Sequence, residues 1–413
     1  MNERPSDAAA PGPAGLPGFT PAEVPVTDPY PHYHRYRTAA PVHLAADGSY
    51  YVFGHAEVAQ VLSGRRDYVR GPVPARIPQD CPHLSRTVAN WMVFMDPPEH
   101  TRVRALVSRS FTPRTVQALR PRIRRIAARL AEQLADTLAG HGEADLVAGF
   151  AAPLPVLVIS ELLGVPERDR DWFRARALDL EQATSSRTGR RADGFALAEA
   201  AAGELDAYFR AELRRPGRAD RGDLIGLMLR HGAGLSEDTL VGTCVHLLTA
   251  GHETTTNLLA KGLLALLAHP GQLAALRSGL LPPAAAVEEL VRYDPPVQMI
   301  TRRARERDVL AGRTIPAGSK LVLVLGSANR DPAHFPHPDR LDLARDTHRH
   351  CGFGTGIHYC VGAPLARAEA ELGLAALLAR IPRPALSTRS AEPLRYARDL
   401  VFHGPSRLML QGD

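Results

Sequence analysis

A cysteine in a glycine-rich loop is the residue of this chain best suited to chemistry. Residues 353–362 read Phe-Gly-Thr-Gly-Ile-His-Tyr-Cys-Val-Gly, and good helix formers follow from Ala363 onward. Glycines at this frequency indicate unusual backbone angles or close approach to a bulky group. Cys360 is therefore expected where a loop enters a helix, a position that lowers the pKa of a cysteine. Its thiolate could bind a metal; the alternative is a buried cysteine in a tight turn.

The spacing of this loop, Phe-Gly-x-Gly-x-His-x-Cys-x-Gly, resembles the haem-binding loop of the cytochrome P-450 superfamily, the haem-thiolate monooxygenases. The resemblance implies a haem b whose iron is ligated by the Cys360 thiolate, which favours O–O cleavage. It also implies that Phe353 shields the sulfur and that Gly354 and Gly362 belong to the haem-binding loop. The implied fold is mainly α with small β-sheets, a triangular prism with haem between a long central helix and the helix after Cys360.

A second motif, Ala-Gly-His-Glu-Thr-Thr at residues 250–255, lies inside a long helical stretch. Its His-Glu pair would suit a zinc protease only with a histidine four residues after the first, and Thr256 stands there instead. Glycine followed by threonines is poor helix material, and threonine hydroxyls can bond the carbonyl four residues earlier. A polar patch on a solvated face is the alternative, but leucines on both sides of the motif favour a buried helix.

By the same resemblance, this motif is similar to the oxygen-activating acid–alcohol pair of the family. Thr254 would hydrogen-bond the bound oxygen, Glu253 would relay protons from solvent, and Gly251 would leave room for O2. Ala250 lies one turn before Thr254 and belongs to the same predicted catalytic face. We expect the coupling of electron use to product formation, rather than haem binding, to depend on Glu253 and Thr254.

The sequence Glu-x-x-Arg at residues 289–292 indicates a structural role only together with the resemblance to the family. Glu289 and Arg292 share a helix face, and alone such a pair is a weak surface interaction. Their place, about seventy residues before Cys360, is similar to that of the structural Glu-x-x-Arg of the family. The resemblance implies that Arg340 locks Glu289 and Arg292 beneath the haem, as part of the folding apparatus.

Basic residues in the order of the family would hold the two haem propionates, because buried carboxylates need paired cationic donors. His100 and Arg104 stand four residues apart on one predicted helix. The resemblance adds Arg302 and His350, with Arg303 as an open alternative to Arg302. A solvated surface position is the alternative for each arginine taken alone.

Composition indicates a soluble globular enzyme. The chain has 413 residues, 45% hydrophobic and 23% charged, with a net charge of +6. No apolar stretch approaches the eighteen residues of a membrane helix, and the Pro/Ala/Gly-rich start has no signal-peptide core. We therefore expect a cytoplasmic protein without a membrane partner. Scattered arginines argue against nucleic-acid binding, and four cysteines without a CxxC pair argue against disulfides.

The predicted elements give the motifs their positions. Residues 1–20 are predicted to be a disordered tail, and 21–413 a single cytochrome P-450 catalytic domain with a β-rich N-terminal part and a helix-rich part. Residues 42–53 predict a β-hairpin around Asp47-Gly48, and residues 236–268 predict the longest helix. Other helices are predicted at 55–62, 98–110, 121–138, 153–163, 168–182, 195–213 and 283–293, and strands near 297–301 and 321–325. A long loop is predicted over 64–90, and a mobile connection over 184–191.

The substrate pocket is expected on the oxygen side of the haem. Its predicted lining is apolar and suits a lipophilic small molecule: Met92, Val93, Val297, Met299 and Phe402. His246 lies two turns before Thr254 on the same helix face and is predicted to bond a substrate carbonyl or hydroxyl; a core histidine is the alternative. A macrolide, macrolactam, terpenoid or steroid-like secondary metabolite would fit, with hydroxylation, epoxidation and oxidative coupling all open.

Electrons must come from another protein, because 413 residues leave no room for a fused reductase domain. By likeness to the family, Arg102, Arg109 and Arg114 lie on the thiolate side, where they would dock an acidic ferredoxin served by a ferredoxin reductase. One alternative is a peroxide-driven or coupling haem-thiolate enzyme, and Glu253-Thr254 argues against the peroxide-driven class. The other is a haem-binding sensor or scaffold without turnover.

Overall fold

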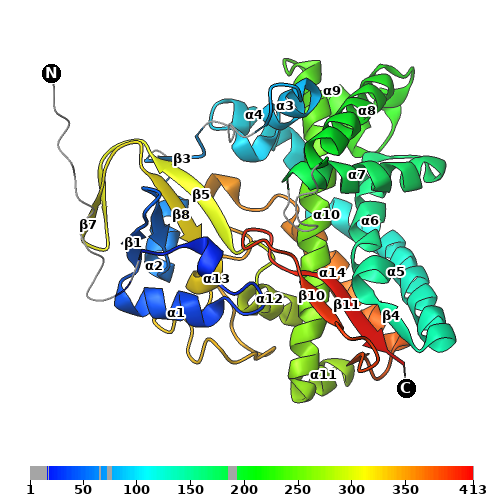
Figure 1. Cartoon of the computed structure of the whole chain (residues 1–413). Helices are drawn as coiled ribbons and strands as arrows, with labels where there is room; N and C mark the ends of the chain where they lie inside the picture. The colour runs from blue at the N-terminus through cyan, green and yellow to red at the C-terminus, as the bar shows by residue number, and fades with distance from the viewer. Residues whose placement is uncertain (1–15, 17, 65–66, 72–76, 185–192, 413) are drawn as a thin grey trace.

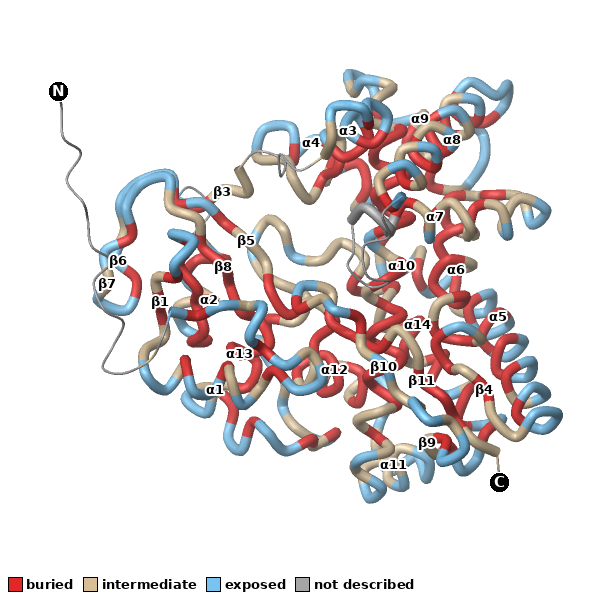
Figure 2. The backbone as a smooth tube through the Cα atoms, in the orientation of Figure 1, coloured by how far each residue is buried: buried red, intermediate tan, exposed pale blue. Residues whose placement is uncertain are grey.

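The computed structural model describes residues 16, 18–64, 67–71, 77–184 and 193–412. A β-rich part and a helix-rich part lie side by side, and the long helix α10 (Glu237–Ala268) runs from the top to the bottom of the helix-rich part (Figure 1). Buried residues concentrate along α10 and the elements around it (Figure 2). The fold is mainly helical with small sheets, as predicted.

The β-rich part contains a five-stranded sheet in the order β1-β2-β8-β5-β3. The strands β1 (Val42–Leu44) and β2 (Tyr50–Val52) form the predicted hairpin, with Val42 opposite Val52. Its turn holds Gly48 at φ 75°, in the left-handed region that favours glycine. The other strands are β3 (Tyr68–Val69), β5 (Met299–Ala304) and β8 (Lys320–Val324). The sheet therefore joins the beginning of the chain to its last third.

Short helices and two smaller sheets complete this part and the C-terminal end. Around the large sheet lie η1 (Pro21–Glu23), α1 (Tyr30–Ala39), α2 (His55–Ser63) and α13 (Leu325–Ala328). The smaller sheets are formed by β6 (Asp308–Leu310) with β7 (Arg313–Ile315), and by β10 (Leu394–Tyr396), β11 (Pro405–Gln411), β4 (Glu143–Asp145) and β9 (Ala385–Leu386).

The predicted N-terminal tail ends before residue 20. Phe19 is buried, and its ring centroid lies 5.0 Å from that of Tyr36, 4.7 Å from that of Tyr51 and 5.0 Å from that of Phe53. Aromatic packing of this kind removes a large apolar area from water, so residues 18–20 belong to the folded part. The rest of the predicted tail, 1–15 and 17, lies outside the described residues.

The predicted helices are confirmed, with ends that differ by a few residues in most cases. The helix-rich part contains α3 (Pro82–Ala89), α4 (Glu99–Ser108), α5 (Pro113–His141), α6 (Pro153–Leu163), α7 (Arg170–Thr184), α8 (Gly194–Arg214), α9 (Leu224–His231), α10, α11 (Pro270–Arg277), α12 (Pro283–Tyr293) and α14 (Ala363–Arg380). Single turns lie at η2 (Met92–Phe94), η3 (Val147–Ala151), η4 (Glu167–Asp169), η5 (Arg218–Asp220) and η6 (Gly356–His358). The helix α5 begins before the predicted start at Pro121, because Thr112 caps it and accepts from the Thr115 amide.

The prediction of a long loop over 64–90 was wrong for two segments. Strand β3 pairs with β5, with Tyr68 opposite Ala304, and helix α3 begins with Pro82 and buries Leu84 and Val88. An eight-residue helix is too short to show a clear 3.6-residue period, which is why the sequence did not indicate it. Within this stretch residues 65–66 and 72–76, and from the predicted mobile connection residues 185–191, lie outside the described residues.

Helix α10 crosses the whole helix-rich part. Its 32 residues give a length of about 48 Å. Ser236 caps it by accepting from the Thr239 amide, and Glu237 and Asp238 occupy the first turn, as predicted. Among the described residues no single helix is long and apolar enough to span a membrane; α10 and α11 pass only as a pair bent by 111°.

A buried ion pair links α12 to the irregular chain that follows α13. Glu289 and Arg292 are fully buried and form two hydrogen bonds of 2.6 and 2.8 Å. The guanidinium group that completes the trio belongs to Arg345, whose Nε lies 3.2 Å from Glu289 Oε1. The predicted third member, Arg340, has an exposed side chain and contributes only its carbonyl, 3.4 Å from Arg292. The prediction was wrong because the chain folds back here, and Arg345 bonds the carbonyls of Pro336, His337 and Arg340.

This geometry predicts unequal effects for two arginine substitutions. Arg345→Ala should lower the free energy of unfolding by about 2 kcal/mol, because it leaves the buried Glu289 carboxylate with one fewer charged donor. Arg340→Ala should change it by less than about 0.5 kcal/mol, since its side chain lies in solvent. Chemical denaturation of both variants measures the difference, and equal losses would contradict the assignment.

Candidate active site

A cavity of about 1210 Å³ lies between α10 and the loop that leads into α14. The α10 wall includes His246, Ala250, Glu253 and Thr254, and the loop wall includes Cys360. Its other walls include the segments 21–26, 91–94, 296–301 and 398–402, together with residues such as Arg70, Leu84 and Phe195. The cavity therefore brings together the two sequence motifs, a segment near the beginning of the chain and a segment near its end.

The loop around Cys360 is folded tightly by its glycines. The Cys360 amide donates to the Phe353 carbonyl over 2.9 Å. Gly354 and Gly356 have φ values of 68° and 71°, and a Cβ on Gly356 would lie 2.3 Å from the carbonyl oxygen of Leu62. A Cβ on Gly362 would lie 3.9 Å from the Cys360 sulfur. The glycines thus let the loop pass against α2 and bring the backbone close to the sulfur.

The thiol of Cys360 does not have the lowered pKa expected at a helix start. Burial raises its pKa, and the Gly362 amide and the Arg104 guanidinium lower it by less. A cation bound at the sulfur would offset this effect of burial and lower the pKa of the thiol, because a thiol that coordinates a metal is deprotonated. The other cysteines, Cys81, Cys244 and Cys351, are buried and do not line the cavity.

The second motif presents a hydroxyl and a carboxyl group on the α10 wall. Thr254 Oγ1 donates to the Ala250 carbonyl over 2.9 Å, and both residues line the cavity. Glu253, beside Thr254, also lines the cavity and is buried. Gly251 does not line it, but a Cβ on Gly251 would meet no atom within 4 Å. Because Gly251 lies outside the cavity lining, that open space does not support the predicted room for O2, which stays a prediction.

Four of the basic residues that line the cavity form a cluster, Arg70, His100, Arg104 and His358. Arg302 is not part of the lining, but its charge acts on the pKa values of His100 and His358, so we count it with this basic cluster. The rings of His100 and His358 lie 4.2 Å apart. Burial, followed by the charges of Arg302 and the other members, lowers the pKa of His358 to about 2. Within the described part of the chain no carboxylate forms an ion pair with any of the three arginines. This set of donors fits a ligand that brings its own negative charge.

Three comparisons place the chain among known proteins. The sequence model of the family "Cytochrome P450" matches residues 284–382. The cytochrome P450 monooxygenase PikC of Streptomyces venezuelae is 39% identical over 392 residues, 91% of this chain and 89% of its own length. The chain belongs to the cytochrome P450 family. The 6-deoxyerythronolide B hydroxylase of Saccharopolyspora erythraea is 36% identical over 406 residues, 92% of this chain and 97% of its own length. The crystal structure of P450BioI with an acyl carrier protein ligated to hexadec-9Z-enoic acid superposes with a TM-score of 0.84 at 34% identity, covering 94% and 98% of the two chains.

Cytochromes P450 are monooxygenases that carry haem b on a cysteine thiolate, and the residues of this chain fit that group. Cys360 is the one of its four cysteines, all in the described part, that lines the cavity. The basic cluster has no carboxylate ion pair among the described residues, and it offers donors for two propionates: Arg70, His100, Arg104, Arg302 and His358. Buried His100 Nε2 has no hydrogen-bond partner among the described residues, so the chain alone leaves this nitrogen unsatisfied.

The prediction that His350 holds a haem propionate was wrong for this cytochrome P450. His350 Nε2 lies 3.1 Å from Glu288, which also pairs with Arg367, and His350 does not line the cavity. Burial acts to raise the pKa of Glu288, but hydrogen bonds from His350 and Arg367 outweigh it and lower the pKa to about 2. The histidine in the cluster is His358, within the Cys360 motif itself. The motif spacing could have indicated it, whereas Arg70 lies in a stretch without a pattern.

Side chains alternate between the two faces of the sheet along strand β5, and this decides whether Arg302 or Arg303 belongs to the basic cluster. Arg302 is 5% exposed and acts on the pKa values of both His100 and His358. Arg303 points to the other face of the sheet, where it is exposed and donates to the Gly318 carbonyl over 3.1 Å. Arg302 is therefore the member of the basic cluster.

The predicted pocket residues all line the cavity: Met92, Val93, His246, Val297, Met299 and Phe402. Val297 and Phe402 form an isolated β-bridge, which explains how two segments distant in sequence build one wall. Phe353 also lines the cavity, and Arg367 Cζ lies 4.5 Å from the centroid of its ring. The N-terminal wall over residues 21–26 was not predicted, because no helical or strand period marks it.

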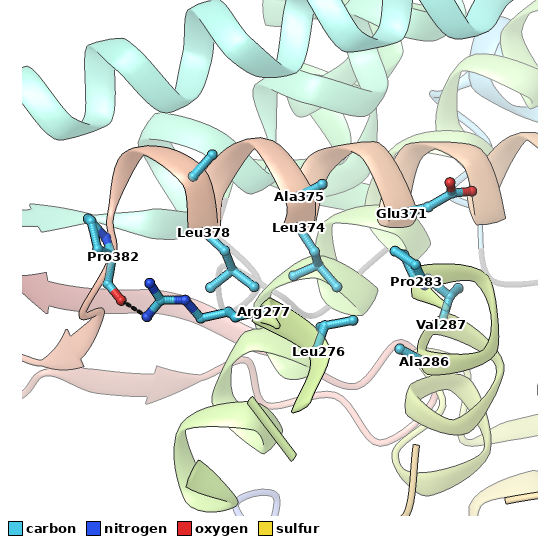
Figure 3. A pocket seen from close by; sticks show the side chains of 11 residues that line it. Leu276, Arg277, Pro283, Ala286, Val287, Glu371, Leu374, Ala375, Leu378 and Pro382 are labelled. Carbon is cyan, nitrogen blue, oxygen red and sulfur yellow. Dashed lines mark hydrogen bonds between the residues drawn. The ribbon is translucent and has the colours of Figure 1, made fainter. Parts of the chain in front are cut away.

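A second cavity, of about 390 Å³, lies between α11, α12 and α14 (Figure 3). Its lining is mostly aliphatic, and Figure 3 shows Leu374 and Leu378 extending from α14 toward the side where Leu276 lies. The two charged residues in it are already bonded: Glu371 pairs with Arg120, and Arg277 donates to the Pro382 carbonyl. This cavity therefore offers no group for the family chemistry.

Haem retention should distinguish the two histidines. His358→Ala should speed haem loss several-fold, because it removes a donor from the basic cluster. His350→Ala should leave the rate within about twofold, since Glu288 keeps Arg367 as its partner. Transfer of haem to an excess of apomyoglobin measures both rates. Faster loss from His350→Ala than from His358→Ala would contradict the placement of the two residues.

Proposed function

We propose that this cytochrome P450 inserts one oxygen atom of O2 into a lipophilic secondary metabolite by hydroxylation or epoxidation. One observation carries the proposal: the Cys360 sulfur and the Glu253-Thr254 pair line the same cavity from its two walls. Residues 21–413 would act as a single catalytic domain, since the β-rich and helix-rich parts both line that cavity.

In this proposal Cys360 ligates the haem iron, and bound haem supplies O2 binding and its reductive activation. Phe353 covers the sulfur, and His100, Arg104, Arg302 and His358 hold the propionates, with Arg70 beside them. The Thr254 hydroxyl donates its one proton to the Ala250 carbonyl, so its oxygen can accept a hydrogen bond at the cavity wall and can pass a proton on when the bond to Ala250 is released. The neighbouring Glu253 carboxyl would resupply that proton from solvent.

The substrate would be a sizeable lipophilic molecule. The lining from Met92, Val93, Val297, Met299 and Phe402 is apolar and spans a cavity that also has to hold the haem. A relative named for the hydroxylation of 6-deoxyerythronolide B supports a macrolide; a macrolactam, terpenoid or steroid-like scaffold would meet the same lining.

Bacterial cytochromes P450 take electrons from redox partners, and we propose a ferredoxin with its reductase for this chain. Arg102 and Arg109 are exposed on α4 and just after it, and Arg114 is exposed at the start of α5. The charge of Arg104 on the same helix acts on Cys360, which supports a position of this helix near the thiolate. Three exposed cations there suit an acidic partner.

The acid–alcohol pair is tested by Thr254→Ala. This variant should keep its haem and its substrate-induced spin shift, but yield at least about tenfold less product per NADH and release peroxide, because proton delivery is lost. Thr256→Ala is the matched control, since its hydroxyl makes the same bond to the residue four earlier but lies outside the cavity lining. Unchanged coupling in Thr254→Ala would refute the proposed role.

The docking surface is tested by ionic strength. Changing Arg102, Arg109 and Arg114 together to glutamine should slow the association of an acidic ferredoxin about tenfold at low salt and flatten its salt dependence. Changing Arg124, Arg125 and Arg129, three exposed arginines on α5, is the matched control. Stopped-flow reduction gives the rates, and a salt dependence equal in both triple variants would rule out the proposed surface.

A further inference from the structure

A lysine lies buried on α10 in a chain that otherwise uses arginine. Among its 50 Lys and Arg residues the chain has two lysines, Lys261 and Lys320. Lys261 is 2% exposed. An ammonium group is more compact than a guanidinium and carries its three donors on one atom, so it suits a narrow site with several acceptors around it. The choice of lysine at this position therefore indicates such a site.

The ammonium group of Lys261 bonds two segments that are far from it in sequence. Its Nζ lies 2.6 Å from Asp294 Oδ1 and donates to the Pro295 carbonyl over 3.0 Å, both in the loop between α12 and β5. It also bonds His403, over 2.8 Å to Nδ1 and over 3.2 Å to the carbonyl. Lys261 thus joins α10 to the loop after α12 and to the turn before β11.

These two segments carry part of the cavity wall. The His403 amide donates to the Pro296 carbonyl over 2.8 Å. Next to these residues, Val297 and Phe402 form the isolated β-bridge, and both line the cavity. Lys261 itself is not part of the lining. It therefore contacts the backbone that carries the Val297–Phe402 wall without facing a bound ligand.

The carboxylate beside Lys261 is charged. Burial acts to raise the pKa of Asp294, but other groups, with the charge of Lys261 first among them, outweigh it and hold the pKa below its usual range. Asp294 Oδ1 also accepts from Tyr30 Oη over 2.5 Å and from Gln298 Nε2 over 3.1 Å. The carboxylate therefore has neutral donors of its own, and Lys261 adds the bond to α10.

Lys261 stands at a fixed distance from the hydroxyl of the acid–alcohol pair. It lies seven residues after Thr254 on α10, almost two full turns, so the two side chains leave the helix on the same side. The two positions are about 10 Å apart along the helix axis. Because the helix is continuous between them, the bonds at Lys261 fix the Val297–Phe402 wall relative to Thr254.

We propose that Lys261 is a positioning residue that determines substrate specificity. Its bonds set the distance between the Val297–Phe402 wall and Thr254, and this distance decides which ligands fit and which carbon is oxidised. The proposal rests on the proposed function and deepens it, because it assigns specificity to a residue that touches no substrate. Without Lys261 the wall can move away from α10, so larger ligands gain affinity relative to smaller ones.

Two variants separate this role from stability alone. Lys261→Met removes the ammonium group and keeps an unbranched side chain, but it leaves the Asp294 carboxylate buried without its cation. Combining Lys261→Met with Asp294→Asn removes both charges. The double variant should unfold at a higher temperature than the single variant, yet it still lacks the bonds to Pro295 and His403. We expect both variants to lose specificity to the same degree.

Two ring ketones measure that loss in the haem-loaded enzyme. Spin-shift titration gives the dissociation constants of cyclododecanone and cyclopentadecanone, and their ratio reports how strictly the wall limits ligand size. In both variants we expect this ratio to shift at least about fivefold toward the larger ring, since a fixed wall discriminates between ligands by single methylene groups. Hydrogen exchange read by mass spectrometry should become faster in segments 22–28, 294–300 and 399–405 of both variants.

A second buried cation provides the matched control. Arg218 is also buried and pairs with Glu212 and Asp223, and all three residues lie outside the cavity lining. Arg218→Met should therefore lose stability, as Lys261→Met does. It should keep the wild-type ratio of the two ketones and the wild-type exchange rates of the three segments.

Three results would overturn the proposal. The first is a wild-type ketone ratio in Lys261→Met, or in the double variant if the single variant does not fold. The second is a double variant that regains the ratio together with stability, because the role of Lys261 would then be stability alone. The third is faster exchange with an unchanged ratio, since the wall would then move without affecting specificity. Failure of the proposed function is recognised separately, because neither ketone would then shift the spin state of the wild type, and that result would refute both statements.

Discussion

Positive charge gathered at one cavity without a carboxylate ion pair is the constraint on which the rest of this structure depends. Arg70, Arg104 and Arg302 lie around one cavity with two histidines, and among the described carboxylates Asp96 is the one whose charge acts on the cluster. An unpaired buried charge costs several kcal/mol. The chain alone therefore leaves this region incomplete, and a group that brings two carboxylates completes it. Binding of haem and stability of the fold are linked in consequence, because a ligand held only by the folded state shifts the folding equilibrium.

The same constraint explains why two parts of different secondary structure have to meet. Arg302 comes from β5 in the β-rich part, whereas His100 and Arg104 come from α4 and His358 from the loop before α14. Strand alternation delivers Arg302 to the inner face and leaves Arg303 outside. On the opposite wall the long buried helix supplies Glu253 and Thr254 in rigid positions. The sheet and the helices thus each fix one side of the cavity, and neither side has a function without the other.

Short-range patterns were the predictable part of this molecule. The hairpin around Gly48, the Ser236 cap and the loop at Cys360 depend on residues that are neighbours in sequence, and all were predicted. The six predicted pocket residues followed from helix periodicity and from family likeness. The errors lie where the chain is irregular: over 330–350 no period fixes which side chain turns inward, so Arg345 was missed in favour of Arg340, and His350 was placed at the haem. Phe19 and the 21–26 wall were missed because their order depends on packing against residues far along the chain.

The irregular walls of the cavity are held by a single buried ammonium group. Lys261, two turns beyond Thr254 on α10, lies 2.6 Å from Asp294 and 2.8 Å from His403 Nδ1, and it donates to the carbonyls of Pro295 and His403. Because an ammonium group only donates, His403 Nδ1 must accept, and its Nε2 carries the proton that bonds the Val26 carbonyl. Val26, Pro296 and Phe402, at or next to these contacts, line the cavity. The three protons of the ammonium group are shared among these four acceptors, and the Asp294 carboxylate balances its charge, which is what makes a lysine tolerable at this depth. The three segments are therefore fixed together or not at all, which is how short stretches with little regular structure can form a defined pocket.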